Sequence, residues 1–235
     1  MYKRQDQVRA RYARRAATVP PARYSPLQPD VWQTLQERQR ALIGLLRRHG
    51  ATAPGELALV EVGCGSGGNL LELLRLGFDP ARLTGIELLP ERLAQARAVL
   101  PPALALLECD AAAAPLAPAS QDLVLQATVF SSLLDRAFQH RLAATMWRWL
   151  RPGGAVLWYD FTVDNPRNPD VRGLPLARVH ELFPEGRVDI RRVTLAPPLA
   201  RAVCAVHPAL YTLCNLLPPL RTHLLAWIEK PAPPP

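Results

Sequence analysis

The sequence predicts an α/β fold with a doubly wound, mostly parallel sheet whose two faces are covered by helices. Short apolar segments typical of buried strands alternate with helical segments along most of the chain, which favours such a sheet. A glycine-rich turn, GCGSGG, joins the first strand segment to the helical segment after it. At 235 residues, 49% of them hydrophobic, the chain can bury the core of one such domain with appendages.

A helical cap is predicted before the sheet. One helix is expected at 6–17 and a second at 29–49, which ends at Gly50 as its C-cap. Between them, VPPARYSPLQP contains too much proline for a helix and predicts an ordered linker. The expected parts of the chain are the cap 1–50, the sheet domain 51–230 and a disordered tail 231–235.

Strand and helix segments follow one another through the sheet domain. The strands are short runs rich in leucine, valine and isoleucine, and the helices are longer runs that also carry charged residues. In chain order, the predicted elements are the strand 57–62, the helix 69–76, the strand 82–87, the helix 90–100, the strand 104–108, the strand 122–126, the helix 133–150, the strand 155–161, a short helix from about 175, the strand 187–195 and the strand 222–229.

An apolar insert, about 196–220, separates the last two predicted strands. It should form two short helices broken at Pro208. Packing beside the sheet is the plainest interpretation, and a lid, a dimer surface or a peripheral membrane contact are the alternatives. Arg201 and His207 interrupt its apolar surface, which favours core packing or a lid.

The net charge of +8 raises the question of a nucleic-acid partner. Lys3 and Lys230 are the only lysines among 28 basic residues, and alanine, leucine and proline are abundant. This profile indicates a bacterial GC-rich genome, so a codon effect explains the charge better than a nucleic-acid partner does. The chain contains no uncharged apolar run long enough for a transmembrane helix, and its charged start does not resemble a signal peptide.

The cysteines show neither a CxxC pair nor a Cys/His spacing typical of zinc sites. Two of them fall at predicted strand ends, where a small buried thiol is ordinary. We therefore expect a cytoplasmic protein with no disulfide and no metal site. The four are Cys64, Cys109, Cys204 and Cys214.

The glycine turn is compatible with two cofactors. Gly63, Gly65 and Gly68 satisfy the dinucleotide pattern, with Glu87 about twenty residues further on for a ribose. Glu61 stands two positions before the first glycine, however. A carboxylate there suits a ligand with an ammonium group better than it suits a pyrophosphate. The residues therefore leave a nicotinamide cofactor open but favour a cationic one.

In order and spacing, these motifs resemble those of class I S-adenosylmethionine (SAM)-dependent methyltransferases. The resemblance covers 57–161 and implies a Rossmann-like sheet of seven strands, the last of them antiparallel. The chain also resembles bacterial members associated with glycan or specialised-metabolite gene clusters. The motifs are EVGCGSG, LTGIELLPERLAQAR, LECDAAAAPL, QDLVLQATVFSSLLD and WLRPGGAVLWYD.

The resemblance implies a set of SAM contacts. Glu61 would face the ammonium group, Glu87 would hold the ribose hydroxyls, and Asp110 would accept from the adenine amino group. Gln126 would line the methionine half, and a tyrosine from the cap would meet the SAM carboxylate. The expected cofactor residues are Glu61, Gly63, Cys64, Gly65, Gly67, Glu87, Leu88, Asp110, Ala111, Gln126, Tyr12 and Tyr24.

The acceptor should approach at the carboxyl ends of the strands, where loops at 126–135 and after 161 begin. Asp160 could orient or deprotonate a hydroxyl, or it could cap the turn. Thr128 lies at a strand end. No spacing of a histidine with an acid marks a general base, so a structural role is expected for the histidines, with His223 as the best-placed exception. The expected acceptor contacts are Phe130, Tyr159, Asn165, Arg167 and Asn168.

We expect O-methylation of a sugar or another small polar molecule. The NPPY-type signature of DNA amino-methylating enzymes is absent after the fourth strand, where the sequence is QATV. Three further functions stay open: a methyltransferase acting on RNA, a nicotinamide-dependent oxidoreductase, and a non-catalytic module that keeps the SAM-binding fold.

Overall fold

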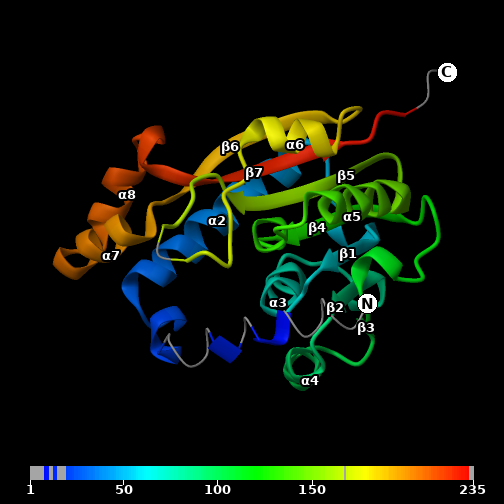
Figure 1. Ribbon diagram of the computed structural model, residues 1–235, viewed down its shortest axis with the longest axis horizontal. Coiled ribbons are helices and arrows are strands. Elements are labelled where there is room, and N and C mark those ends of the chain that lie inside the picture. Colours follow the sequence, from blue (N-terminus) through cyan, green and yellow to red (C-terminus); the bar gives the residue numbers. More distant parts are fainter. Residues whose placement is uncertain (1–7, 11–12, 15–19, 167, 233–235) are drawn as a thin grey trace. The chain divides into compact units, whose positions relative to one another are not determined.

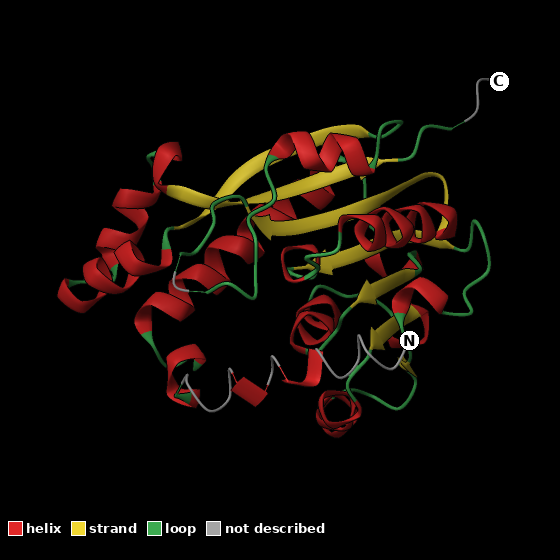
Figure 2. Ribbon diagram, viewed as in Figure 1, coloured by secondary structure: helices red, strands yellow, loops and turns green. Residues whose placement is uncertain are grey.

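The computed structural model describes residues 8–10, 13–14, 20–166 and 168–232. Its sheet has seven strands in the order β3-β2-β1-β4-β5-β7-β6 (Figures 1 and 2). The strands are β1 (Leu59–Val62), β2 (Leu83–Glu87), β3 (Ala105–Glu108), β4 (Gln121–Ala127), β5 (Leu150–Phe161), β6 (Arg187–Leu195) and β7 (Arg221–Glu229). The α-helices are α2 (Pro29–Arg48), α3 (Gly68–Arg75), α4 (Pro90–Val99), α5 (Arg136–Trp149), α6 (Leu176–Leu182), α7 (Pro197–Val206) and α8 (Ala209–Asn215).

The directions of the strands confirm the expected fold class. β1 pairs in parallel with β2 and with β4, and the β2–β3 and β4–β5 pairs are parallel too. The last strand is antiparallel, because Gly153 and Gly154 near the start of β5 exchange 2.8 Å hydrogen bonds with Lys230 just after β7. The strand order reverses between β1 and β4, the point at which doubly wound sheets bind ligands.

Two boundaries differ from the predicted ones near the sheet. α5 begins at Arg136, because Asp135 is its N-cap and accepts a 3.2 Å bond from the Phe138 amide. The preceding Phe130–Ser132 forms the short 3₁₀ helix η5 instead. β5 begins at Leu150, before the predicted 155, because Leu150 already pairs with Gln121 across an irregularity in the ladder.

The secondary structure before the sheet agrees with the prediction where it is described. Residues 8–10 and 13–14 are helical, and the rest of the predicted helix 6–17 lies outside the described residues. The predicted linker contains a short 3₁₀ helix, η1 (Pro21–Tyr24), in which proline occupies the first position and costs no hydrogen bond. Helix α2 follows with almost its predicted bounds.

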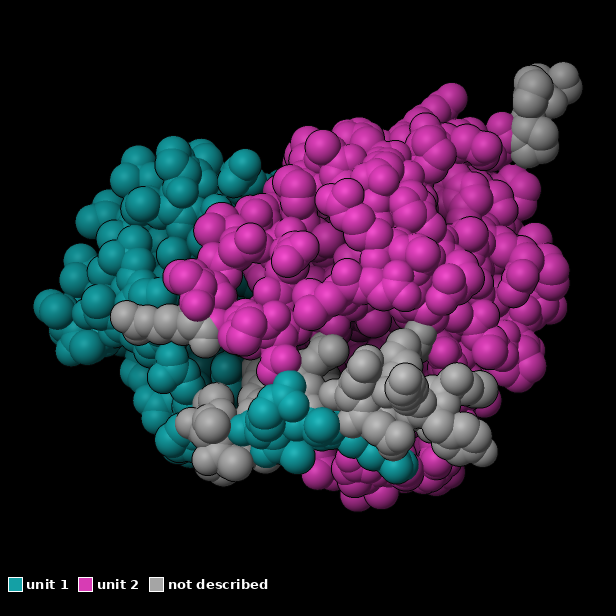
Figure 3. Space-filling model, viewed as in Figure 1, with its two compact units in different colours: residues 1–44, 191–223 teal, residues 45–190, 224–235 magenta. Residues whose placement is uncertain are grey.

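The chain divides into two compact units (Figure 3). Unit 1 consists of residues 1–44 and 191–223, and unit 2 of residues 45–190 and 224–235. The insert, which forms α7 and α8 as predicted, thus groups with the N-terminal residues. Among the described helices, none is long and apolar enough to cross a membrane.

Each unit has its own core. In unit 2, α5 and α6 lie on the face of the sheet nearer the viewer in Figure 1, over Val124, Val156 and Trp158. The Trp158 ring lies 4.7 Å from that of Phe130, and both are fully buried. In unit 1, the described residues include a small buried cluster of Leu195, Ala200, Cys204 and Tyr211.

Candidate active site

The glycine turn joins β1 to α3 and is closely surrounded. Gly63 and Gly67 have backbone φ values of +69° and +85°, which glycine alone adopts without strain. A Cβ atom at Gly63 would lie 2.7 Å from Cγ2 of Val129 in the loop after β4. A Cβ atom at Gly65 would collide with the guanidinium of Arg92 on α4. At Gly63, Gly65 and Gly67 a side chain would therefore be strained or would displace a neighbour.

Glu61, near the end of β1, is fully buried beside this turn. Its Oε1 accepts a 2.6 Å hydrogen bond from Nδ2 of Asn69 in the first turn of α3. Burying a carboxylate is costly unless hydrogen bonds or an opposite charge compensate. The position of Glu61 therefore favours a positively charged group at this end of the sheet.

Glu87 closes β2 and connects two turns. Its Oε2 accepts a 2.9 Å bond from the Gly65 amide. Its Oε1 accepts bonds of 2.8 and 3.0 Å from the amides of Leu88 and Leu89. A carboxylate has about four acceptor positions, so three backbone bonds leave it capacity for a hydroxyl donor.

Cys64 lies between these two carboxylates and is buried. Burial raises the pKa of its thiol well above the ordinary value, and the charges of Glu61 and Glu87 raise it further. The thiol therefore stays neutral and does not serve as a nucleophile. All four cysteines are free thiols, and among the described residues no group of three or more His, Cys, Asp or Glu could hold a metal ion.

Asp110 follows β3, next to the end of β2. The Cys109 amide donates a 3.2 Å bond to the carbonyl of Glu87, which brings the two strand ends together. Asp110 is the N-cap of the 3₁₀ helix η4 (Ala111–Ala113) and accepts a 3.1 Å bond from the Ala112 amide. The sheet thus collects Glu61, Glu87 and Asp110 at the carboxyl ends of three adjacent strands.

The loop after β4 starts with a strained residue. Thr128 has a φ of +58°, a left-handed conformation that costs a β-branched residue about 1–3 kcal/mol. Its amide donates a 2.8 Å bond to the Tyr159 carbonyl on β5, and its hydroxyl donates to the Ala127 carbonyl. Buried Gln126 accepts a 3.2 Å bond from the Val129 amide. Thr128 itself is exposed, so its hydroxyl oxygen can still accept a hydrogen bond.

Asp160 is fully buried and faces backbone amides. Its Oδ2 accepts a 3.1 Å bond from the Ser131 amide in η5, and its Oδ1 accepts a 3.0 Å bond from the Phe161 amide. Burial raises the pKa of Asp160 to about 7, although these hydrogen bonds oppose the shift. Of the two roles expected for this residue, the geometry favours capping the turn.

A second buried side chain, that of Gln139, also makes hydrogen bonds to η5. Gln139 of α5 donates bonds of 3.2 and 2.7 Å from Nε2 to the carbonyls of Phe130 and Leu133. Its Oε1 accepts bonds of 2.9 and 2.8 Å from the buried guanidinium of Arg178 on α6. Arg178 also pairs with Glu181 at 2.5 Å. Helices α5 and α6 thereby position the loop after β4.

The loop between β5 and α6 (Figure 2) contains hydrogen bonds between its own residues. The Asn168 amide donates 2.9 Å to the Asn165 carbonyl, and Asn168 Oδ1 accepts 3.2 Å from the Asp170 amide. At its end, the Arg172 amide donates a 2.8 Å bond to the Ser131 carbonyl. The loop is thus tied to η5, and Asn165 is exposed while Asn168 is half-buried.

Several predicted site residues lie in the core of unit 2, in unit 1 or outside the described residues. Phe130 is in the core against Trp158, so its ring does not form an open wall. His223 and Tyr24 belong to unit 1, and burial lowers the pKa of His223 to about 4, with Arg38 adding to the shift. Tyr12 and Arg167 lie outside the described residues.

Sequence reasoning missed three residues of this region. Asn69 had a signal, because it directly follows the glycine turn at the start of a helix. Arg92 and Gln139 had no signal in the sequence, because each contacts residues that belong to a different element of the fold. Neither Ser131 nor Ser132 caps α5, because their hydroxyls donate to the carbonyls of Thr128 and Val129.

Residues 60–158 match a family model described as a methyltransferase domain. No curated protein matches the chain. Solved structures do: a SAM-dependent methyltransferase from Mesorhizobium loti is 16% identical with a TM-score of 0.58, over 81% of this chain and 96% of that one.

Two further structures resemble the chain. A SAM-dependent methyltransferase from Archaeoglobus fulgidus is 12% identical with a TM-score of 0.54, over 83% of this chain and 96% of that one. A geranyl diphosphate C-methyltransferase from Streptomyces coelicolor A3(2), solved with Mg²⁺, geranyl diphosphate and S-adenosyl-L-homocysteine, is 16% identical with a TM-score of 0.57, over 81% and 77%. Because the identities are low, the similar structures support only the fold of this chain. The family model supports a methyltransferase domain over residues 60–158.

Proposed function

We propose that the chain is a class I SAM-dependent methyltransferase that methylates a hydroxyl group of a small polar molecule or a glycan. The observation that carries this choice is the charge of unit 2, which contains the glycine turn and both acceptor loops. Unit 2 has fifteen Arg and Lys residues against seventeen Asp and Glu residues. A nucleic-acid acceptor would need a basic surface for its phosphates, which this balance does not supply.

The residues at the glycine turn suit SAM, which supplies an electrophilic methyl group on a sulfonium centre. Buried Glu61 would attract the ammonium group, and the remaining acceptor capacity of Glu87 would take ribose hydroxyls. Cys64, Gly65, Gly67 and Leu88 would shape the turn beneath them. We assign adenine contacts to Asp110 and the Ala111 amide, and the methionine half to Gly63 and Gln126.

The loops after β4 and β5 would hold the acceptor. Thr128 is exposed, strained and fixed by its bond to the Tyr159 carbonyl, so its hydroxyl oxygen would orient the acceptor hydroxyl. Asn165 and Asn168, in the loop after β5, would contact the acceptor as well. Asp160 would act as a positioning residue, because both of its oxygens already hold backbone amides.

Incubation of the purified protein with methyl-labelled SAM and separate sets of sugars, small hydroxyl compounds and RNA tests the proposal. We expect mass analysis to find the label on an oxygen of a small compound. Thr128→Gly, which is compatible with the positive φ, should retain the fold and lower transfer at least about tenfold. Label on RNA alone would overturn the acceptor class.

Cofactor titrations distinguish a methyltransferase from an oxidoreductase and from a non-catalytic module. We expect SAM, and not NAD, to bind to the purified chain. Binding of NAD alone would favour an oxidoreductase. SAM binding without transfer to any compound would leave a non-catalytic module as the better description.

A further inference from the structure

The insert exposes apolar side chains that its own core does not use. Ala200, Cys204 and Tyr211 face the small core of unit 1. On the outside of α7, α8 and the turn after them lie four others, which we call the insert patch. Their exposed fractions are Val206 78%, Leu213 61%, Leu216 65% and Leu217 57%.

The two helices of the insert lie side by side (Figure 1). Among the described residues, eleven large apolar side chains are exposed, and seven of them belong to unit 1 although it is the smaller unit. Four of these seven form the insert patch. Single exposed apolar residues are normal, but such a concentration on one short segment marks an interaction surface.

The charge around the patch indicates what covers it. Between Asp189 and Glu229 the chain contains no acidic residue. Unit 1 as a whole has thirteen Arg and Lys residues against three Asp and Glu residues. One of these three, Glu37, accepts a 2.9 Å bond from the Thr194 amide and lies near Arg221 and Arg40. The segment that carries the patch is therefore apolar and basic and has no acidic residue of its own, although Asp30 of α2 lies near Cys204.

We propose that the insert patch docks onto the surface of an anionic lipid bilayer. Val206 and the three leucines would enter the boundary between headgroups and acyl chains, and Arg201 would meet lipid phosphates. α7 and α8 have ten and seven residues, so they would lie along the surface rather than cross it.

The same charge pattern disfavours a second copy of the chain as the occupant. Two insert patches facing each other would bring arginine against arginine, with no carboxylate in either segment to pair with them. A bilayer containing anionic lipids supplies the missing negative charge. The proposal is independent of which acceptor the methyltransferase uses.

Vesicle flotation with the full chain tests the proposal. We expect the protein to float with vesicles of phosphatidylcholine and phosphatidylglycerol, and to stay in solution with phosphatidylcholine alone. The combined variant Leu213→Ser, Leu216→Ser and Leu217→Ser should lower the vesicle-bound fraction at least about tenfold. Arg201→Gln should lower it roughly fivefold.

Val99→Ser is the matched control, because Val99 is exposed on α4 in unit 2; it should bind vesicles like the unchanged protein. Circular dichroism checks that each variant is folded. The proposal is overturned if the unchanged protein ignores anionic vesicles or if the triple leucine variant still binds them. It is also overturned if the leucine changes abolish a concentration-dependent dimer instead of vesicle binding.

Discussion

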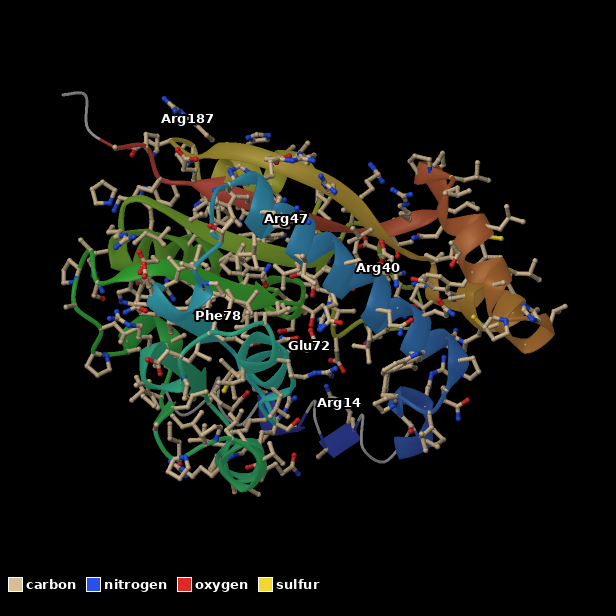
Figure 4. All side chains as sticks on the ribbon, turned by 180° about the vertical axis from the view of Figure 1, so that it is seen from behind. Arg14, Arg40, Arg47, Glu72, Phe78 and Arg187 are labelled. Carbon is tan, nitrogen blue, oxygen red and sulfur yellow. The ribbon has the colours of Figure 1, made fainter. Side chains whose placement is uncertain are left out.

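The two units of this chain differ in net charge and in the extent to which they bury their apolar side chains. Unit 2 has a net charge of −2, buries aromatic residues under α5 and α6, and contains the acidic strand ends at the glycine turn. Unit 1 has a net charge of +10 and, among the described residues, a small buried cluster and most of the exposed large apolar side chains. Arg40 and Arg47 both lie on helix α2 (Figure 4), and the boundary between the units falls between them in the sequence.

The net charge of +8 is therefore an average over two opposite regions. The codon explanation treats the charge as evenly spread, but codon usage gives no reason for acidic residues to avoid 190–228. Charge argues about partners only for the surface that carries it. In this chain, the positive charge is evidence about the partners of unit 1. It is no evidence that the acceptor loops of unit 2 bind a negatively charged molecule.

The largest expected effect concerns the core of unit 2. Phe130→Ala removes a fully buried ring that packs on Trp158. It should lower the free energy of unfolding by about 3–5 kcal/mol, measured by urea denaturation. Val163→Ala, at an exposed position, is the control. A loss below about 1 kcal/mol would mean that Phe130 lines an open site, as the sequence suggested.

The next effect concerns the acidic strand ends of unit 2. Glu87→Ala removes the acceptor for the amides of Gly65, Leu88 and Leu89, in addition to the proposed ribose contacts. We expect the affinity for SAM to fall at least about a hundredfold in calorimetry. Exposed Glu91→Ala, at the start of the helix that follows, should leave it unchanged. Equal affinities for both variants would refute the cofactor assignment.

A smaller effect is expected where α5 and α6 hold the loop after β4. Gln139→Leu leaves the carbonyls of Phe130 and Leu133 without their donor and deprives Arg178 of an acceptor. The free energy of unfolding should fall by about 2–3 kcal/mol. Exposed Gln95→Leu on α4 should change it by less than about 0.5 kcal/mol. A similarly small change for Gln139→Leu would show that the loop does not depend on this bond.

The two units should respond to pH in opposite directions. In unit 2, the pKa of Asp160 is about 7 in the folded state against 3.8 ordinarily. Between those values the folded state keeps a proton that the unfolded state has lost, so this group lowers stability as pH rises. In unit 1, the pKa of His223 is about 4 in the folded state against 6.5 ordinarily. There the unfolded state holds the extra proton, so stability from His223 rises with pH.

Because the two contributions have opposite slopes, the free energy of unfolding of the unchanged protein should depend only weakly on pH between pH 4 and 7. Denaturation curves across this range separate the two contributions. Asp160→Asn should leave the rising slope of His223, and His223→Gln should leave the falling slope of Asp160. Identical pH profiles for both variants and the unchanged protein would contradict both pKa shifts.

The smallest effect is expected at the surface of unit 1. Leu213→Ser replaces an exposed side chain outside the small core, so the free energy of unfolding should change by less than about 0.5 kcal/mol. Thermal unfolding followed by circular dichroism measures it. A loss comparable with that of Phe130→Ala would mean that the leucine is buried and would remove the insert patch.

The order and type of the elements could be predicted because their signals are local. The bounds of α2, α3, α4 and β6 lie within a residue or two of the predicted ones, since apolar periodicity and proline or glycine boundaries are contained in a few consecutive residues. The start of α5 was predicted too early. The serines of η5 look like helix caps in sequence, but Asp135 takes that place.

By itself, the sequence determined the doubly wound fold, the glycine turn and the acids at the ends of β1, β2 and β3. Each depends on residue type and spacing along the chain. Only the tertiary structure decided that Asp160 holds η5, that Phe130 faces the core, and that 191–223 groups with the N-terminal residues. These outcomes depend on contacts between residues far apart in the chain, because burial and hydrogen-bond partners are set by packing and not by neighbouring sequence.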